Sequence, residues 1–238
     1  MIFVLIIVFG LLTFVGFMFF RNFVVRWIIG GLSFVILALS VGMLTLHIKD
    51  NWGMKNVTTQ TSHQIFTAGD KDAPYGLMIK SEIGKDTGNY VLIFRNDENS
   101  AKYDINFTPD QKHIVEAVKK TATYKLTKSD TAKVVTTTTR REFGSNLMKS
   151  LFDAGNEQND LVKKRSVVYV PRDTWLVLTA DQVKKLEKES PAMQAQMQAE
   201  LKANPAKAAQ LAELQKSNPQ EYAKMQVQQI KQLLGIKK

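Results

Sequence analysis

Residues 1–48 read MIFVLIIVFGLLTFVGFMFFRNFVVRWIIGGLSFVILALSVGMLTLHI, which is two long apolar runs joined by one short basic connection. The runs cover residues 1–20 and 27–48, and neither contains Asp, Glu, Lys or Arg. A helix needs about 20 apolar residues to cross about 30 Å of hydrocarbon. We therefore predict a transmembrane hairpin of two spans, because the connection at 21–26 is too short for anything but a tight turn.

A cleaved secretory signal is the alternative for the first run, but such a signal starts with a basic segment and residues 1–5 are apolar. Within the hairpin we expect helix packing at Gly31, Ala38 and Gly42, because small residues let helix backbones approach closely in lipid. The glycine-rich composition common to membrane helices explains the same residues equally well.

The orientation of the hairpin is not decided by the number of basic residues near its ends. Arg21 and Arg26 on one side balance Lys49 and Lys55 on the other. The two arginines lie in a very short loop, where the positive-inside rule is most reliable, so they favour a cytoplasmic loop. The absence of cysteine suits an extracytoplasmic domain in an organism that avoids disulfides outside the cell. We expect a cell-membrane protein whose soluble domain is extracytoplasmic, with a cytoplasmic domain as the alternative.

Changes in composition divide the chain into four parts. Residues 1–48 form the hairpin, residues 49–55 a junction, residues 56–178 a soluble domain and residues 179–238 a tail. The soluble domain is long enough to bury a core of its own, whereas the tail is rich in alanine and glutamine and buries little.

Short runs rich in β-branched and aromatic residues recur through the soluble domain and predict strands. They lie at residues 75–79, 90–95, 102–107, 123–126, 133–141, 166–170 and 174–179. Their spacing predicts a mainly β (α+β) domain that resembles a small antiparallel sandwich or barrel. Two short helices are expected as well, at 109–118, where a strand is the alternative, and at 145–153.

The tail is predicted to be helical from Thr179 onwards. Three helix starts follow at 14-residue intervals, at Ser190-Pro191, Asn204-Pro205 and Asn218-Pro219, because a Ser or Asn cap followed by proline suits a first turn. These 14-residue repeats place Met197, Leu211 and Met225 at equivalent positions.

The last part of the tail is richer in apolar residues than the rest. We therefore predict that Tyr222, Met225 and Ile230 contact a protein partner. A frayed extension without a partner is the alternative.

The net charge of +10 is spread along the chain rather than concentrated in one segment. Candidate contacts for an anionic partner are Arg140, Arg141, Lys163, Lys164 and Arg165. An anchored basic domain meets anionic lipid headgroups or, outside a Gram-positive cell, anionic wall polymers. The basic clusters are too short to indicate nucleic-acid binding, and a solvated charged face is the alternative.

Sequence motifs give little indication of catalysis. Without cysteine there is no thiol nucleophile or thiolate metal site, and His47, His63 and His113 are isolated. Residues 84–88 lack the order of a phosphate-binding loop, and residues 70–75 do not fit a calcium loop. We expect no enzymatic activity, no cofactor and no metal, with a site assembled from distant residues left open.

Three segments carry a resemblance to a known family. The hairpin with its short basic connection, the run AKVVTTTTRR at 132–141 and the run KRSVVYVPRDTWLVL at 164–178 resemble an uncharacterised family of two-span membrane proteins, a domain of unknown function, in lactic-acid and related Gram-positive bacteria. The resemblance covers about residues 1–188 and implies a Gram-positive cell membrane and no known activity. The repeated tail lies outside it.

Together these features predict a membrane-anchored, non-enzymatic interaction or accessory module of the cell envelope. The expected partners are the lipid bilayer, a membrane or envelope protein, and an anionic wall polymer or lipid headgroup. The alternatives are an envelope hydrolase and an accessory subunit of a larger membrane transporter. A hydrolase should show a concave pocket with convergent polar groups such as His63 or His113.

Overall fold

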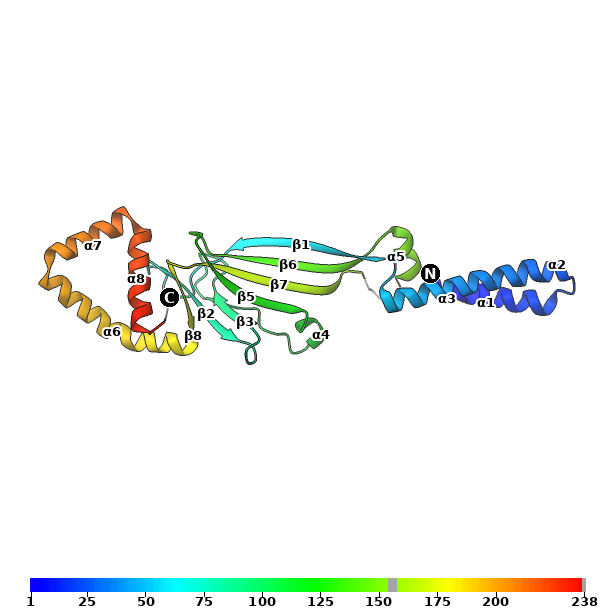
Figure 1. Ribbon diagram of the computed structural model, residues 1–238, viewed down its shortest axis with the longest axis horizontal. Coiled ribbons are helices and arrows are strands. Elements are labelled where there is room, and N and C mark those ends of the chain that lie inside the picture. Colours follow the sequence, from blue (N-terminus) through cyan, green and yellow to red (C-terminus); the bar gives the residue numbers. More distant parts are fainter. Residues whose placement is uncertain (154–157, 237–238) are drawn as a thin grey trace. The chain divides into compact units, whose positions relative to one another are not determined.

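The computed structural model describes residues 1–153 and 158–236, and the chain separates into two units that we describe individually. The first unit comprises Met1–Thr59 and Thr138–Lys163, and the second comprises Gln60–Thr137 and Lys164–Lys238. The boundary between them falls within the strands β1 (Met54–Gln64), β6 (Lys133–Phe143) and β7 (Asp160–Pro171), which Figure 1 labels.

The first unit begins with two apolar helical stretches. The first stretch is α1 (Ile2–Phe19), and the second consists of α2 (Phe23–Arg26), the π-helical turn η1 (Trp27–Gly31) and α3 (Leu32–Asp50) in uninterrupted succession. The second stretch begins where the Asn22 side chain accepts a hydrogen bond of 2.9 Å from the backbone N–H of Val24. Both stretches are long and apolar enough to cross a membrane.

The two helical stretches approach each other through glycine. A Cβ atom added at Gly16 would lie 2.5 Å from the Cα atom of Gly30, so the two backbones are in close contact there. The buried positions that follow on α3 are Ser33, Ser40 and His47, seven residues apart each time. Large apolar side chains on the other faces remain exposed, as at Phe19, which is 74% exposed.

The structure therefore shows a packing face different from the predicted one. Ala38 and Gly42 are exposed, and a Cβ atom at Gly42 would meet nothing within 4 Å. Gly31 is half-buried, but a Cβ atom there would meet only Trp27 of its own stretch. The physical reason is that the backbone contact forms at Gly16 and Gly30, and regular helical spacing places the buried Ser33, Ser40 and His47 on the face of α3 opposite Ala38 and Gly42.

A short helix, α5 (Asn146–Phe152), packs against the start of α1. Ser145 caps it by accepting a hydrogen bond from the backbone N–H of Met148, which confirms the helix predicted at 145–153. The terminal ammonium group of Met1 donates to the carbonyl oxygens of Ser150 and Leu151 at 3.0 and 2.9 Å. These carbonyls have no partner within the helix, so the ammonium group satisfies them.

Within residues 1–153 and 158–236, eight strands form two four-stranded sheets. One sheet has the order β1-β6-β7-β5, with β5 at Lys120–Thr127, and the other has the order β4-β3-β2-β8. The strands of the second sheet are β4 (Asp104–Asn106), β3 (Tyr90–Phe94), β2 (Gly76–Glu82) and β8 (Trp175–Thr179). All seven predicted strands are present, and β1 is the strand that the pattern missed, because most of its residues are polar and exposed.

Both sheets are mixed, so the predicted purely antiparallel arrangement is wrong. The strand β5 pairs with β7 in parallel, and β2 pairs with β8 in parallel, whereas β2–β3 and β3–β4 are antiparallel. Parallel neighbours need long crossover connections, which no local sequence pattern specifies. Residues of both sheets share one buried cluster, including Met78, Phe94, Val134 and Val168, as the layers of a sandwich do.

The helix predicted at 109–118 is reduced to the single turn α4 (Ile114–Ala117). Residues 109–113 remain irregular, and Asp110 accepts hydrogen bonds from the backbone N–H of Lys112 and pairs with His113. This local bonding by an aspartate competes with helix formation at the expected start.

Over residues 179–236 the tail folds as three helices, α6 (Ala180–Ala203), α7 (Pro205–Ser217) and α8 (Pro219–Leu233). Asn204 and Asn218 cap α7 and α8 as predicted, each accepting a backbone N–H three residues later at 3.1 Å. The helix start predicted at Ser190-Pro191 is wrong, because α6 continues through the proline.

Packing explains why α6 continues. Leu186 and Met193, on either side of Pro191, contact the same apolar cluster, which holds the helix across the proline. The cluster also contains Leu176 and Leu178 of β8 and Val227 and Ile230 of α8. Figure 1 shows α7 joining the far end of α6 to α8, whose own end returns toward the start of α6.

Candidate functional site

The parallel pairing of β5 with β7 brings together two basic segments that are far apart in the sequence. Lys120 lies opposite Lys164, and Thr121 lies opposite Arg165. The backbone N–H of Lys164 also donates to the carbonyl of Lys119 at 2.9 Å. The second unit therefore carries a basic pair, Lys120 and Lys164, flanked by Lys119 and Arg165.

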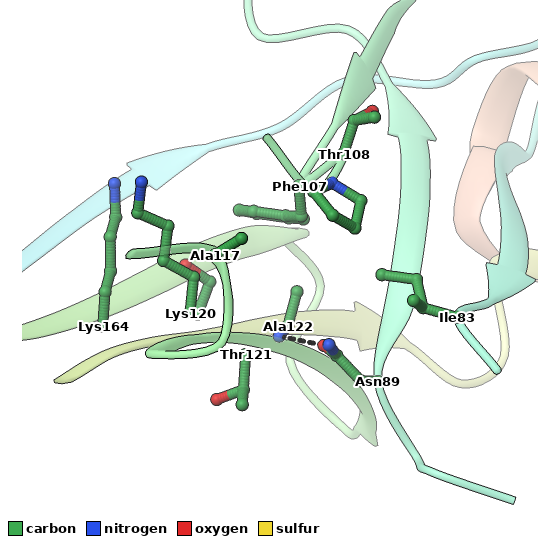
Figure 2. Close-up of a pocket in the computed structure, with 11 residues that line it drawn as sticks. Ile83, Asn89, Phe107, Thr108, Ala117, Lys120, Thr121, Ala122 and Lys164 are labelled. Carbon is green, nitrogen blue, oxygen red and sulfur yellow. Dashed lines mark hydrogen bonds between the residues drawn. The ribbon is translucent and has the colours of Figure 1, made fainter. Parts of the chain in front are cut away.

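A cavity of about 220 Å³ lies beside the basic pair. Figure 2 shows Lys120 and Lys164 extending in the same direction at one end of this cavity, with Ile83 and Asn89 at the other. Between these ends the wall is mostly apolar and includes Phe107, Ala117 and Ala122. The site thus joins two ammonium groups to an apolar interior.

The polar groups of the wall hold the cavity in shape. The Asn89 side-chain oxygen accepts a hydrogen bond of 2.6 Å from the backbone N–H of Ala122, which ties the second sheet to β5. Buried Ser166 and Thr136 share a hydroxyl hydrogen bond of 2.9 Å. These groups are satisfied within the molecule, so the lysines are the groups best placed to bind an incoming anion.

The electrostatics of the basic pair favour an anionic ligand. The Lys120 ammonium group lies 3.1 Å from the Glu116 carboxylate, and both side chains are exposed. Lys164 is half-buried and forms no ion pair with any residue that the structure describes. Like charges directly opposite each other on paired strands are destabilising, and Glu116 pairs with Lys120, so an anion beside Lys164 would relieve the repulsion that remains.

The structure separates the five predicted anionic-partner contacts. Lys164 and Arg165 join the basic pair and its flank, whereas Arg140, Arg141 and Lys163 belong to the first unit. The Arg140 guanidinium donates to the Asn159 carbonyl at 2.6 Å, and the Arg141 guanidinium donates to the Asn51 side chain at 2.7 Å. Both arginines therefore have structural partners within their own unit.

Lys119 and Lys120 are the site residues that the predicted contacts omit. Their adjacency was visible in the sequence, but nothing local indicated that β5 would align with β7 in parallel. The register is decided by the burial of Ala122, Val168 and Val170 on the inward face, and it carries the lysines into opposition.

The predicted protein contacts in the tail lie at different depths. Ile230 is only 1% exposed and packs inside the apolar cluster with Leu176 and Leu178, so it is not available to a partner. Tyr222 and Met225 are half-buried, and the Tyr222 hydroxyl accepts a hydrogen bond of 3.3 Å from Gln226. The apolar character that suggested a partner surface at Ile230 serves the packing of α8 on the sheet.

None of the three histidines lines the cavity beside the basic pair or a second cavity, lined in part by Arg95 and Trp175. His47 is buried and stacks on Phe152 at a centroid distance of 4.3 Å, and His63 is exposed on β1. His113 lies at the surface, where its hydrogen bond lowers the pKa of Asp110. Among residues 1–153 and 158–236, no group of three or more His, Asp or Glu side chains could hold a metal.

The fold defines a class of protein: two apolar N-terminal helices, then an α+β domain with two mixed sheets, then C-terminal helices. The chain belongs to the family described as Domain of unknown function (DUF4811), whose model matches residues 22–186. No curated protein and no solved structure matches the chain.

The family match confirms the predicted resemblance to a domain of unknown function. The matched residues, 22–186, are fewer than the predicted 1–188. The match starts in the connection between the two apolar helices and ends within α6. It includes the basic pair, whereas α7 and α8 lie outside it, as predicted for the tail.

Proposed function

We propose that this protein is a membrane-anchored, non-enzymatic binding module that captures an anionic partner of the cell envelope at Lys120 and Lys164. The observation that carries this proposal is the register of β5 and β7, which sets the two lysines opposite each other at one end of a cavity. Two adjacent ammonium groups are an unfavourable arrangement for an isolated domain and a suitable one for binding an anion.

The anchor is the helical hairpin of the first unit. Its outward side chains include Phe14, Phe19, Trp27 and Ile48, all more than half exposed, which is costly in water and favourable in lipid. In our proposal the connection with Arg21 and Arg26 faces the cytoplasm, so the soluble domain is extracytoplasmic. The assignment to a Gram-positive cell membrane rests on the family resemblance noted in the sequence.

The partner chemistry follows from the size and charge of the site. A cavity of about 220 Å³ suits a small anionic group with an apolar neighbour rather than a folded protein surface. Both an anionic wall polymer and a lipid headgroup present phosphate groups of this kind. Lys119 and Arg165 beside the cavity would extend the contact to neighbouring phosphates, making it sensitive to salt.

The tail would add a second contact in this proposal. The 14-residue spacing relates Met197, Leu211 and Met225, which are half-buried on α6, α7 and α8, although α6 does not restart at Ser190. We propose that this repeat, together with Tyr222, meets a membrane or envelope protein. The buried residues of α8 hold the tail on the domain while that contact forms.

The decisive experiment uses the full chain in nanodiscs of zwitterionic lipid. Binding of a soluble poly(glycerol phosphate) is measured for the wild type and for the double variant K120Q/K164Q, and binding to vesicles with anionic lipid is measured in parallel. The matched control is K125Q/K133Q, which removes two exposed lysines from the strands β5 and β6.

At about 1 kcal/mol for each lysine, K120Q/K164Q should weaken binding by about 30-fold. If K120Q/K164Q loses affinity for the polymer alone, the partner is a wall polymer. If it loses affinity for the anionic vesicles alone, the partner is a lipid headgroup. Equal losses for K120Q/K164Q and K125Q/K133Q would contradict a site at the basic pair.

The proposed orientation has a separate test. A protease-sensitive tag after the last residue should be cleaved on intact cells and protected in inverted vesicles. The reverse pattern would place the soluble domain in the cytoplasm, which would remove wall polymers from the candidate partners.

A further inference from the structure

Arg95, at the end of β3, is a buried cation whose hydrogen-bonding capacity is only partly used. The side chain is 8% exposed. Its Nη1 group donates to the carbonyl oxygens of Thr67 and Gly69, at 2.8 Å in the case of Gly69. Those two bonds hold the loop at residues 67–76 against the end of β3.

The opposite edge of the guanidinium is unpaired. Its Nε atom is buried and has no hydrogen-bond partner in the described chain, and Nη2 has none there either. No carboxylate of a described residue lies within 4.0 Å of the group to form an ion pair. A buried charge without a counter-ion is costly, and an unused donor adds to that cost.

This unpaired cation lines a second cavity, larger than the one beside the basic pair. The cavity has a volume of about 490 Å³, which is within the usual range for small-molecule sites. Its wall contains the aromatic residues Tyr75 and Trp175 and the amides Gln64 and Asn99. Flat apolar rings beside amide groups suit a small polar molecule that has at least one apolar face.

The charges on the wall indicate which anion fits. Arg95 and Lys71 are offset by Glu98 and Asp130, so the lining carries no net charge. A doubly charged phosphate would be repelled by the two carboxylates. A single carboxylate would match the Nε and Nη2 donors, because these point in parallel and form two hydrogen bonds with one carboxylate once the wall that buries Nε yields to the ligand.

We propose that the cavity beside Arg95 is a second binding site, which takes a small ligand through one carboxylate bound by the unpaired edge of the Arg95 guanidinium. The site is distinct from the basic pair, which lines another cavity and shares no residue with it. Two sources offer the required group: the free carboxyl end of a short peptide, and a sugar acid.

The test uses the full chain in zwitterionic nanodiscs and two matched pairs of probes. One pair is an N-acetyl dipeptide with a free carboxylate and the same dipeptide as its amide, and the other is glucuronate and glucose. Binding is followed by the NMR signals of the Arg95 Nε–H and the Trp175 indole N–H, assigned by their loss in R95K and W175F. Inorganic phosphate is the third probe.

At least one acid should bind ten or more times as tightly as its neutral partner and shift the Arg95 Nε–H signal. R95K keeps the charge but lacks the two parallel donors, so affinity for that acid, read at Trp175, should fall at least tenfold. The acid that binds identifies the source, and binding of both acids assigns the site to carboxylates generally. K120Q/K164Q should leave this affinity unchanged even if the basic pair proves to have another role.

A variant that leaves Arg95 in place provides a second check, because R95K could disturb the loop at 67–76. E98Q/D130N should bind the acid more tightly and should begin to bind phosphate, since the repulsion from both carboxylates is removed. Equal binding of acids and neutral partners, absence of binding by both acids, or phosphate binding to the wild type as tight as acid binding would overturn the proposal. An unchanged affinity in E98Q/D130N would also contradict it.

Discussion

Gly16 of α1 should be the most sensitive position of the helical hairpin to a single added methyl group. A Cβ atom there would lie 2.5 Å from the Cα and N atoms of Gly30, whereas carbon atoms pack best about 3.5 to 4.0 Å apart. The contact is with backbone, which cannot rotate away, so G16A must move one helix by about 1 Å.

The cost of this movement is set by overpacking, which typically destabilises by about 1 to 3 kcal/mol. Replacing a helical glycine by alanine also favours the helix by about 1 kcal/mol, so the net destabilisation of G16A should be about 0 to 2 kcal/mol. G30A should cost less, because its Cβ would meet the Phe17 ring at 3.1 Å and a side chain can yield.

The matched control is G42A on the same hairpin. A Cβ atom at Gly42 would meet nothing within 4 Å, so this variant should be neutral or slightly more stable than the wild type. Unfolding of the full chain by a denaturing detergent in mixed micelles, followed by circular dichroism, gives the free energy of each variant. If G16A proves as stable as G42A, the close approach of Gly16 and Gly30 is refuted.

Three further outcomes test the second unit. I230A should destabilise the chain by about 2 to 5 kcal/mol in thermal or urea unfolding, because the side chain is fully buried, whereas Q228A at an exposed position of α8 should have little effect. N218A should cost about 1 kcal/mol by removing the cap of α8, and N218D should restore most of that stability, so equal losses in both variants would argue against the cap. Burial, with a smaller contribution from the Asp70 carboxylate, raises the pKa of Tyr75, so its phenol should ionise at higher pH than free tyrosine. Folding therefore favours the protonated phenol, and the contribution of Tyr75 to stability is complete below the ordinary tyrosine pKa and lost as pH rises through the raised value. The absorbance difference between wild type and Y75F follows the ionisation of this phenol with pH. Ionisation at the pH of free tyrosine would contradict the burial of Tyr75.

Local patterns predicted most of the elements but not their partners. The strands at 90–94 and 133–143 and the caps at Ser145, Thr179 and Asn218 follow from alternation and from hydrogen bonds within a few residues. The errors arose where tertiary packing overrides a local signal. Pro191 would start a helix in an isolated segment, but Leu186 and Met193 pack into one cluster across it.

The candidate site was predicted only in part for the same reason. Lys164 and Arg165 were recognised from their sequence neighbours, whereas Lys120 became a site residue only through the register of β5 with β7. Arg95 gave no signal in the sequence, because a strand end rich in apolar residues does not indicate that an arginine there will be buried without a carboxylate.

The amino-acid sequence by itself determined most of the helical and extended segments and that residues 2–19 and 23–50 are apolar enough to cross a membrane. Those properties depend on run length, periodicity and capping, which act over a few residues. Tertiary structure alone decided the contact of Gly16 with Gly30, the opposition of Lys120 and Lys164 and the burial of Arg95. Each of these depends on the alignment of segments that are distant in the chain, which is set by the packing of a shared core and not by any local pattern.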